Sequence, residues 1–96
     1  MKKSEQVLVA KQGSVNNLLE LFQCNFDCEE LKEIALKENS NVNSQVIEVM
    51  MSTWSSYYVL GLIAQHPETP IETLKILSKS NCGHVRIKAK RRLLLG

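Results

Sequence analysis

The segment that decides the fold runs from Val59 to Arg86 and reads VLGLIAQHPETPIETLKILSKSNCGHVR. Val59, Leu62 and Ile63 recur at the spacing of one helical face. The residue before Pro67 is pushed out of the α region, so this first helix has to stop there. The segment therefore predicts a short helix before the proline and a turn after it.

The start signal for the next helix follows this turn. Thr69 suits an N-cap, Pro70 has no N–H to lose at the first helical position, and Glu72 lies three residues beyond the cap. Leu74 and Leu77 then continue an apolar face at helical spacing. These residues predict a second helix, capped by Thr69.

A stop signal and a last helix complete the segment. Gly83, in the run Asn81-Cys82-Gly83, could adopt the left-handed conformation that ends many helices. Beyond it, Val85, Ala89 and Leu93 share one side of a helix predicted over residues 84–95.

Three earlier segments show the same period. One helix is predicted after Ser14, one after a capping box of Asp27 and Glu30, and one over the run from Val46 to Thr53. The run from Glu38 to Asn41 ends the second of these, because Asn and Ser compete for backbone hydrogen bonds. With no period-two strand and no Gly-rich phosphate loop, the sequence predicts an all-α chain of six or seven short helices.

The deciding segment resembles repeats of the leucine-rich repeat variant family, which read roughly V-R-x-x-V-A-x-N-P-x-T-P-x-x-x-L-x-x-L-A-x-D-x-x-x-x-V-R. The residues that align with this pattern, in a register without gaps, are Val59, Ile63, Ala64, His66 (where the family has Asn), Pro67, Thr69, Pro70, Leu74, Leu77, Val85 and Arg86. The sequence departs from the pattern at Leu60, His66, Ser78 and Ser80.

The resemblance implies a short right-handed α-solenoid, or superhelix, of α and 3₁₀ helices, related to HEAT and armadillo repeats. We expect residues 1–96 to form one helical-repeat domain. Within it, 1–30 would be a degenerate N-terminal cap, 31–58 a weak repeat, and 59–96 the best repeat with a basic C-terminal helix. The weak repeat depends on an alignment of Leu31 with Leu74.

Composition sets the broad class. A chain of 96 residues with 44% hydrophobic and 23% charged residues can form one small soluble domain. Three cysteines cannot form a complete set of intramolecular disulfides, which favours a reduced compartment. With no secretion signal and no apolar stretch of membrane-spanning length, we expect a cytoplasmic protein without a membrane partner.

Charge is divided unevenly along the chain. The formal net charge is +2, but residues 1–70 sum to −4 and residues 71–96 to +6. The candidate binding residues in the basic part are Arg86, Lys88, Lys90, Arg91 and Arg92. They predict either a solvated helix face, or nucleic-acid binding through phosphate contacts, or an acidic protein partner.

Aromatic and apolar residues supply the other binding candidates. Trp54 is expected in the core, whereas Tyr57 or Tyr58 is expected to contact a partner, because Trp and Tyr often anchor interfaces. The run from Leu93 to Leu95, which contains Leu94, has no polar cover and predicts an oligomer contact, such as a homodimer through this end.

Catalytic and metal sites find little support. Cys24, Cys28, Cys82 and His84 can be written as a zinc site, but the first pair spans an interhelix turn and a buried stripe, so buried thiols are the preferred interpretation. Cys82 and His84 lack an orienting third group for nucleophilic catalysis. His66 is interpreted as a turn-capping residue.

The sequence therefore predicts a non-enzymatic protein–protein interaction module built from helical repeats, with no catalytic residues, metal or cofactor. Nucleic-acid binding through the basic C-terminal helix is the alternative function.

Overall fold

The structure is a computed structural model that describes residues 2–24, 29–53 and 55–95. The described residues form seven α-helices and no strand, which confirms the all-α prediction. None of them is assigned to a 3₁₀ helix, in contrast to the alternating α and 3₁₀ helices that the resemblance implied. The helices are α1 (Lys3–Gln12), α2 (Val15–Cys24), α3 (Glu29–Glu38), α4 (Ser44–Met51), α5 (Tyr57–Gln65), α6 (Ile71–Leu77) and α7 (Gly83–Leu95).

The starts of α2 and α4 are fixed by side chains that bind free backbone N–H groups. Ser14 and Asn17 form a reciprocal pair before α2, in which the Ser14 hydroxyl accepts from the Asn17 N–H and the Asn17 side chain accepts from the Ser14 N–H. Asn43 caps α4 by accepting from Val46, at 3.0 Å. These contacts confirm the helices predicted after Ser14 and around Val46.

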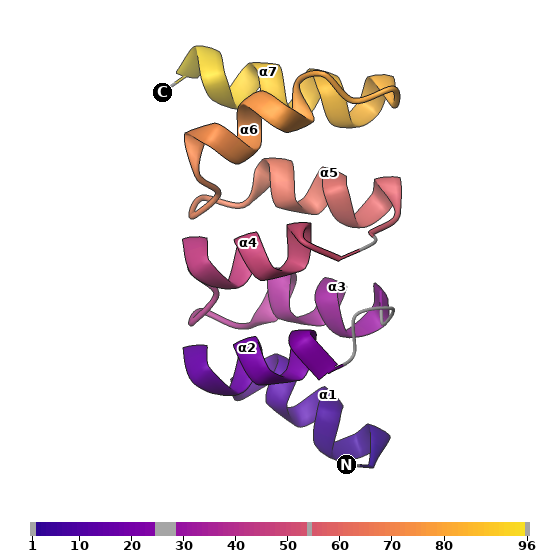
Figure 1. The fold of residues 1–96 in the computed structure, drawn as a ribbon, viewed down its shortest axis with the longest axis vertical. Helices are drawn as coiled ribbons and strands as arrows, with labels where there is room; N and C mark the ends of the chain where they lie inside the picture. Colours follow the sequence, from indigo (N-terminus) through magenta and orange to yellow (C-terminus); the bar gives the residue numbers. More distant parts are fainter. Residues whose placement is uncertain (1, 25–28, 54, 96) are drawn as a thin grey trace.

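The helices form two layers that run along the longest axis of the molecule (Figure 1). In one layer, α3 packs against α1 and α5, and α5 packs against α7. In the other, α2 packs against α4, while α6 packs mainly against α7. The molecule measures 39 × 22 × 18 Å, with its termini at opposite ends of the stack.

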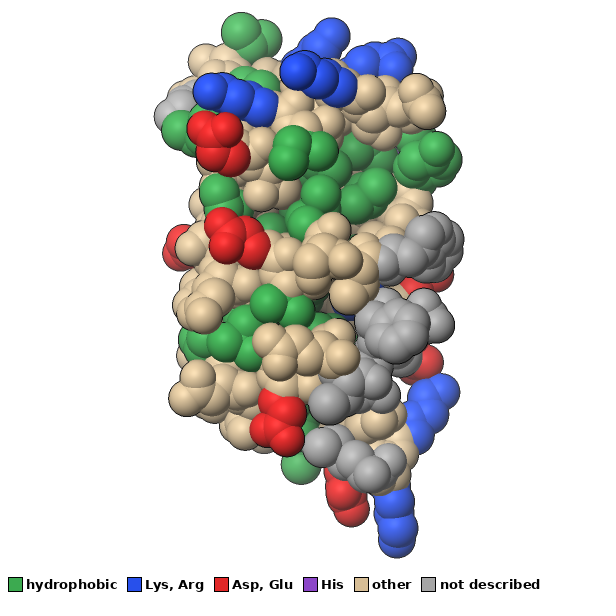
Figure 2. All heavy atoms as spheres, in the orientation of Figure 1, with side chains coloured by type: hydrophobic (Ala, Val, Ile, Leu, Met, Phe, Trp, Pro, Cys, Tyr) green, Lys and Arg blue, Asp and Glu red, His purple; other side chains and the backbone are tan. Residues whose placement is uncertain are grey.

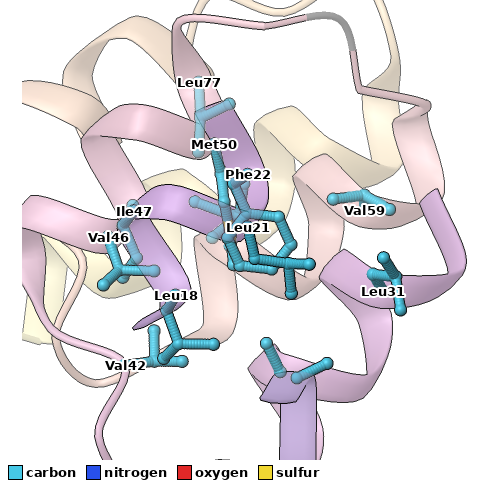
Figure 3. Close-up of a cluster of buried hydrophobic side chains, with 14 of the residues drawn as sticks. Leu18, Leu21, Phe22, Leu31, Val42, Val46, Ile47, Met50, Val59 and Leu77 are labelled. Carbon is cyan, nitrogen blue, oxygen red and sulfur yellow. The ribbon is translucent and has the colours of Figure 1, made fainter. Parts of the chain in front are cut away.

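The core lies between the layers. Side chains of α2 and α4 point toward one another around Phe22 and Met50, both fully buried (Figure 3). Burying side chains of this size stabilises the fold by about 1.5–3 kcal/mol each. Leu31, Val59 and Val85 are buried residues of α3, α5 and α7, so the core continues along the stack.

Equivalent helices recur at nearly constant intervals. The odd-numbered helices begin at residues 3, 29, 57 and 83, which gives intervals of 26, 28 and 26 residues. The even-numbered helices begin at residues 15, 44 and 71, which gives intervals of 29 and 27. The alignment of Leu31 with Leu74 relates α3 to α6 instead, and these helices lie in different layers.

Buried polar side chains join successive units. Asn39, only 4% exposed, donates from Nδ2 to the carbonyls of Ala10 and Gly13 at the end of α1, at 3.0 and 3.1 Å. Lys32 is 1% exposed and donates from Nζ to the Thr53 hydroxyl in the α4–α5 loop, at 2.7 Å. Sequence analysis missed both roles, because it gave buried positions to apolar residues only.

Two predicted boundaries are wrong. Thr69 is not the N-cap of α6; the helix begins after Pro70, and the Thr69 hydroxyl donates back to the carbonyl of Ile63 in α5. Gly83 does not end α6, because this helix already stops at Leu77, and no described glycine has a positive φ. Gly83 is instead the first residue of α7.

Candidate binding surface

The last helix contacts both layers and holds all five of the predicted basic residues. α7 packs against α5 and α6, and its segment contains no Asp or Glu. Among the described residues the ion pairs are Lys3–Glu30, Lys37–Glu33 and Lys75–Glu72, none of which involves α7. The cations of α7 are therefore not neutralised by carboxylates in the part of the chain that the structure describes.

Two of these cations, Arg86 and Arg92, donate hydrogen bonds to backbone carbonyls outside α7. Arg86 donates to the carbonyl of Ser80 in the α6–α7 loop, at 2.9 Å. Arg92 donates from Nη1 to the carbonyl of His66, at 2.6 Å, and more weakly to that of Ala64. Because these carbonyls lie at the end of α5, Arg92 joins α7 to α5.

Three cations of α7 converge on a hollow of about 400 Å³. We call it the basic hollow; its lining residues are Gln65, Lys88, Arg91, Arg92 and Leu95. Positions 88, 91 and 92 lie three and four residues apart, which places them on one helix face. Lys90 is exposed on α7 but does not line this hollow, so the structure separates it from the other three.

A second hollow, of about 440 Å³, lies beside the first. We call it the apolar hollow; its lining residues are Pro67, Thr69, Ile71, Leu74, Arg92, Leu93 and Leu95. Arg92 and Leu95 line both hollows and so form a shared wall. A hollow lined by three cationic side chains and one whose lining side chains are mostly aliphatic thus adjoin where α7 passes the α5–α6 loop.

Next to the basic hollow, side chains of α7 lie over α5. A Cβ at the buried Gly61 would lie 3.4 Å from the His84 ring and 3.9 Å from the Lys88 ammonium, so these α7 side chains lie over α5. On α5, Tyr58, Leu62 and Gln65 occupy one helix face by their spacing. We call these two rows the α5–α7 surface; its members are Tyr58, Leu62, Gln65, His84, Lys88 and Arg91.

Tyr58 is held in place at one end of this surface. Its hydroxyl donates to Glu33, at 3.1 Å, and accepts from Lys37, at 2.7 Å. Hydrogen bonds from Lys37, and then from Tyr58, hold the pKa of the Glu33 carboxyl below its usual value. The bonds of Lys37 with Tyr58 and Glu33 raise the pKa of the Lys37 ammonium. The network fixes a half-exposed aromatic ring across α3 and α5.

The other predicted contact residues are also located. Tyr57 is 54% exposed at the start of α5. Leu93 packs against the core, whereas Leu94 and Leu95 are 87% and 84% exposed. The homodimer predicted through this end stays a prediction.

His66 lies in the α5–α6 loop beneath Arg92. Its Nδ1 accepts from the Glu68 N–H, at 3.1 Å, which confirms the predicted turn-capping role. Partial burial, more than the opposing effect of Glu68, lowers the pKa of the His66 imidazole. The neutral ring is therefore the form that suits this turn.

The opposite face is formed by α2, α4 and α6 and differs in character. Figure 2 shows acidic side chains recurring along this face, with basic ones near its α6–α7 end and again near α1. Each helix of this face contributes one exposed glutamate, namely Glu20, Glu48 and Glu72. This face supplies control positions for experiments on the α5–α7 surface.

Several residues singled out in the sequence lie outside the part of the chain that the structure describes. Asp27 of the predicted capping box, Trp54, Cys28 and the side chain of Cys24 lie outside the described residues. Cys82 is a half-buried free thiol. Within the described ranges no three His, Cys, Asp or Glu side chains are grouped as metal ligands would be. No helix there combines the length and the apolar character that crossing a membrane requires.

Sequence analysis also missed two residues that line the hollows, Gln65 and Ile71. The signal for Gln65 was its spacing from Tyr58 and Leu62, which places all three on one helix face. Ile71 carried no such signal, because only the approach of α7 to the α5–α6 loop gives it a role.

No family model, curated protein or solved structure matches this chain.

Proposed function

We propose that the chain is a non-enzymatic protein-interaction module with the architecture of a short helical-repeat solenoid. Its support is the two-layered stack, in which the odd-numbered helices recur every 26–28 residues. Repeat stacks of this kind present extended surfaces assembled from several helices.

Equivalent residues along the stack support the repeat interpretation. The pairs Leu31-Lys32 and Val85-Arg86 stand at matching positions of α3 and α7, each with a buried apolar residue before a cation. Both cations bind an interhelix loop, although the loops differ: Lys32 donates to Thr53 in the loop before the next odd-numbered helix, and Arg86 donates to Ser80 in the loop before its own helix. α5 has Leu60 at this position, as the departure from the family pattern indicated.

The observation that carries the binding function is the α5–α7 surface with its two adjoining hollows. It combines a ring fixed by hydrogen bonds at Tyr58, the half-buried Leu62, and cations that no described carboxylate neutralises. Aromatic and basic anchors of this kind dominate protein interfaces. A rigid anchor also loses less conformational freedom on binding.

The test is affinity capture with the full chain. A Tyr58→Ala/Leu62→Ser variant changes the α5–α7 surface, and a Gln45→Ala/Glu48→Ser variant of α4 is the matched control. We expect the wild type and the control to enrich the same proteins, as measured by quantitative mass spectrometry, and the first variant to lose most of that enrichment. Circular dichroism melting checks that both variants fold. Identical profiles for all three chains, or no protein enriched by the wild type, would contradict the proposal.

Nucleic-acid binding through α7 is the second candidate function. It is favoured by the convergence of Lys88, Arg91 and Arg92 in a helix without acidic residues. Phosphate contacts of this type give an affinity that falls steeply with salt. Changing these three residues and Lys90 to Ala would then abolish binding to an oligonucleotide at low salt, and absence of any wild-type binding under that condition would end this candidate.

A further inference from the structure

We propose that the two hollows at the end of α7 bind a short acidic–apolar peptide segment of a protein partner, in which an Asp or Glu stands close to a bulky aliphatic or aromatic residue. The carboxylate would occupy the basic hollow and the apolar side chain the apolar hollow. The inference rests on the proposed function and adds the chemical class of its partner.

Charge defines the first half of this ligand. Lys88 is half-buried against α5, and Arg92 is held by its bond to the His66 carbonyl. Arg91 lines the same hollow, and none of its described lining residues is acidic. Because Arg92 is already held by a hydrogen bond, it can bind an anionic group without first losing much side-chain freedom.

The apolar hollow defines the second half. Ile71 is 55% exposed and lines this hollow together with Leu93, which packs on the core. Arg92 and Leu95 line both hollows and separate them. A peptide that fills both hollows would therefore have its acidic residue and its apolar residue close together in its sequence. Leu95, 84% exposed, would be covered by the bound segment.

These features favour a peptide over a nucleic acid. Several cations usually contact a phosphate backbone, but Arg86 of α7 donates to the Ser80 carbonyl, and the exposed Leu94 and Leu95 follow the last cation of the helix. A phosphate backbone has no aliphatic group to fill the apolar hollow beside the cations, whereas a peptide can supply an apolar side chain close to its carboxylate. Charge complementarity thus selects an acidic partner, and the apolar hollow selects a protein.

The experiment starts from selection of phage-displayed random dodecapeptides on the full chain. We expect the selected peptides to be enriched in Asp or Glu within a few residues of Leu, Ile, Phe or Trp. Fluorescence polarisation with one selected peptide then measures its affinity. An Ala substitution at the peptide's acidic residue and one at its apolar residue should each weaken binding.

Matched variants of the protein locate the binding. Lys88→Gln and Arg91→Gln should each weaken the binding of the peptide about two- to fivefold, while Lys90→Gln, on the same helix but outside the hollow, should leave it unchanged. Ile71→Ala should weaken it by a similar factor, while Ile76→Ala, a more exposed residue of α6 that lines neither hollow, should not.

Contrary results would separate a failure of the acidic–apolar ligand from a failure of the proposed protein-interaction function. Selected peptides without acidic residues, or equal effects of Lys88→Gln and Lys90→Gln, would overturn this inference. If such peptides depended on Tyr58 and Leu62 instead, the interaction module would stand without the acidic–apolar ligand. Binding of a 12-nucleotide single-stranded DNA without binding of any peptide would overturn both the inference and the protein-binding proposal.

Discussion

Single polar side chains fix the geometry of this small stack at its loops. Arg92 is the clearest case, because its guanidinium reaches two carbonyls at the end of α5 and also lines both hollows. A buried hydrogen bond to a charged group contributes about 1.5–3 kcal/mol, and this one is partly exposed. The residue therefore contributes to the stability of the fold and to the shape of the proposed site.

Replacing Arg92 with Met keeps most of the aliphatic stem but removes these hydrogen bonds. We expect the free energy of unfolding to fall by about 1–2 kcal/mol, measured by urea denaturation. Arg91→Met is the matched control; because Arg91 is exposed, its effect should stay within about 0.5 kcal/mol. Equal losses in the two variants would show that the contact of Arg92 with the α5–α6 loop does not stabilise the fold.

His66 makes stability depend on pH. Its pKa is lowered in the folded chain by partial burial, so the unfolded chain takes up its proton first as pH falls. The stability contribution is therefore present above the ordinary pKa of about 6.5 and is lost as pH falls through the lower folded value. Thermal melting between pH 7.5 and 5 should show a declining melting temperature that is flatter in His66→Asn. If the melting temperature of His66→Asn fell with pH as steeply as that of the wild type, the pH dependence would come from another group.

At the scale of elements, two glycines at helix contacts differ in whether the structure has room for an added Cβ. Gly61 lies within α5 under His84, where an added Cβ would meet only side-chain atoms, at 3.4 Å or more. At Gly13, an added Cβ would lie 2.5 Å from the Val9 backbone oxygen. Helix interiors favour Ala over Gly by about 0.5–1 kcal/mol.

Gly61→Ala should therefore raise the free energy of unfolding by about 0.5–1 kcal/mol. Gly13→Ala should lower it, since the backbone at the end of α1 has to shift. Chemical denaturation of the two variants beside the wild type measures both changes. A destabilising Gly61→Ala would mean that α7 lies closer to α5 than the structure shows.

The elements also show what the sequence could and could not predict. Helical periodicity located the helices from α2 to α7, since each has buried residues at the expected spacing. It did not identify α1, where Ala10 is the one buried residue and the apolar pattern is weak. The capping role of Thr69 was predicted incorrectly because local rules ignore the carbonyl of Ile63, which its hydroxyl binds instead.

The candidate site was predictable only in its residue types. The basic residues of α7 are evident in the sequence, but which of them converge depends on the seam between α5 and α7. Lys88, Arg91 and Arg92 share a hollow with Gln65, whereas Lys90 does not line it. The apolar hollow depends on how α7 meets the α5–α6 loop, and no local pattern encodes that contact.

At the scale of the whole molecule, the stack has two unlike long faces and an open end. One face carries a glutamate on each of α2, α4 and α6, and the other carries the α5–α7 surface, with the hollows at its end. The exposed Leu94 and Leu95 also make self-association a prediction for this end. Sedimentation velocity over a range of concentrations tests it, with Leu94→Ser/Leu95→Ser expected to restore the monomer if a dimer forms.

The most direct test of the binding account is chemical-shift mapping by NMR on the labelled full chain, titrated with a captured partner or a selected peptide. The account predicts that the largest amide shift changes lie along the α5–α7 surface and around the two hollows, including Gln65, Lys88 and Ile71. Residues of α2 and α4 on the opposite face should change little. Shift changes concentrated on Glu20 and Glu48, with none at Gln65 or Lys88, would contradict it.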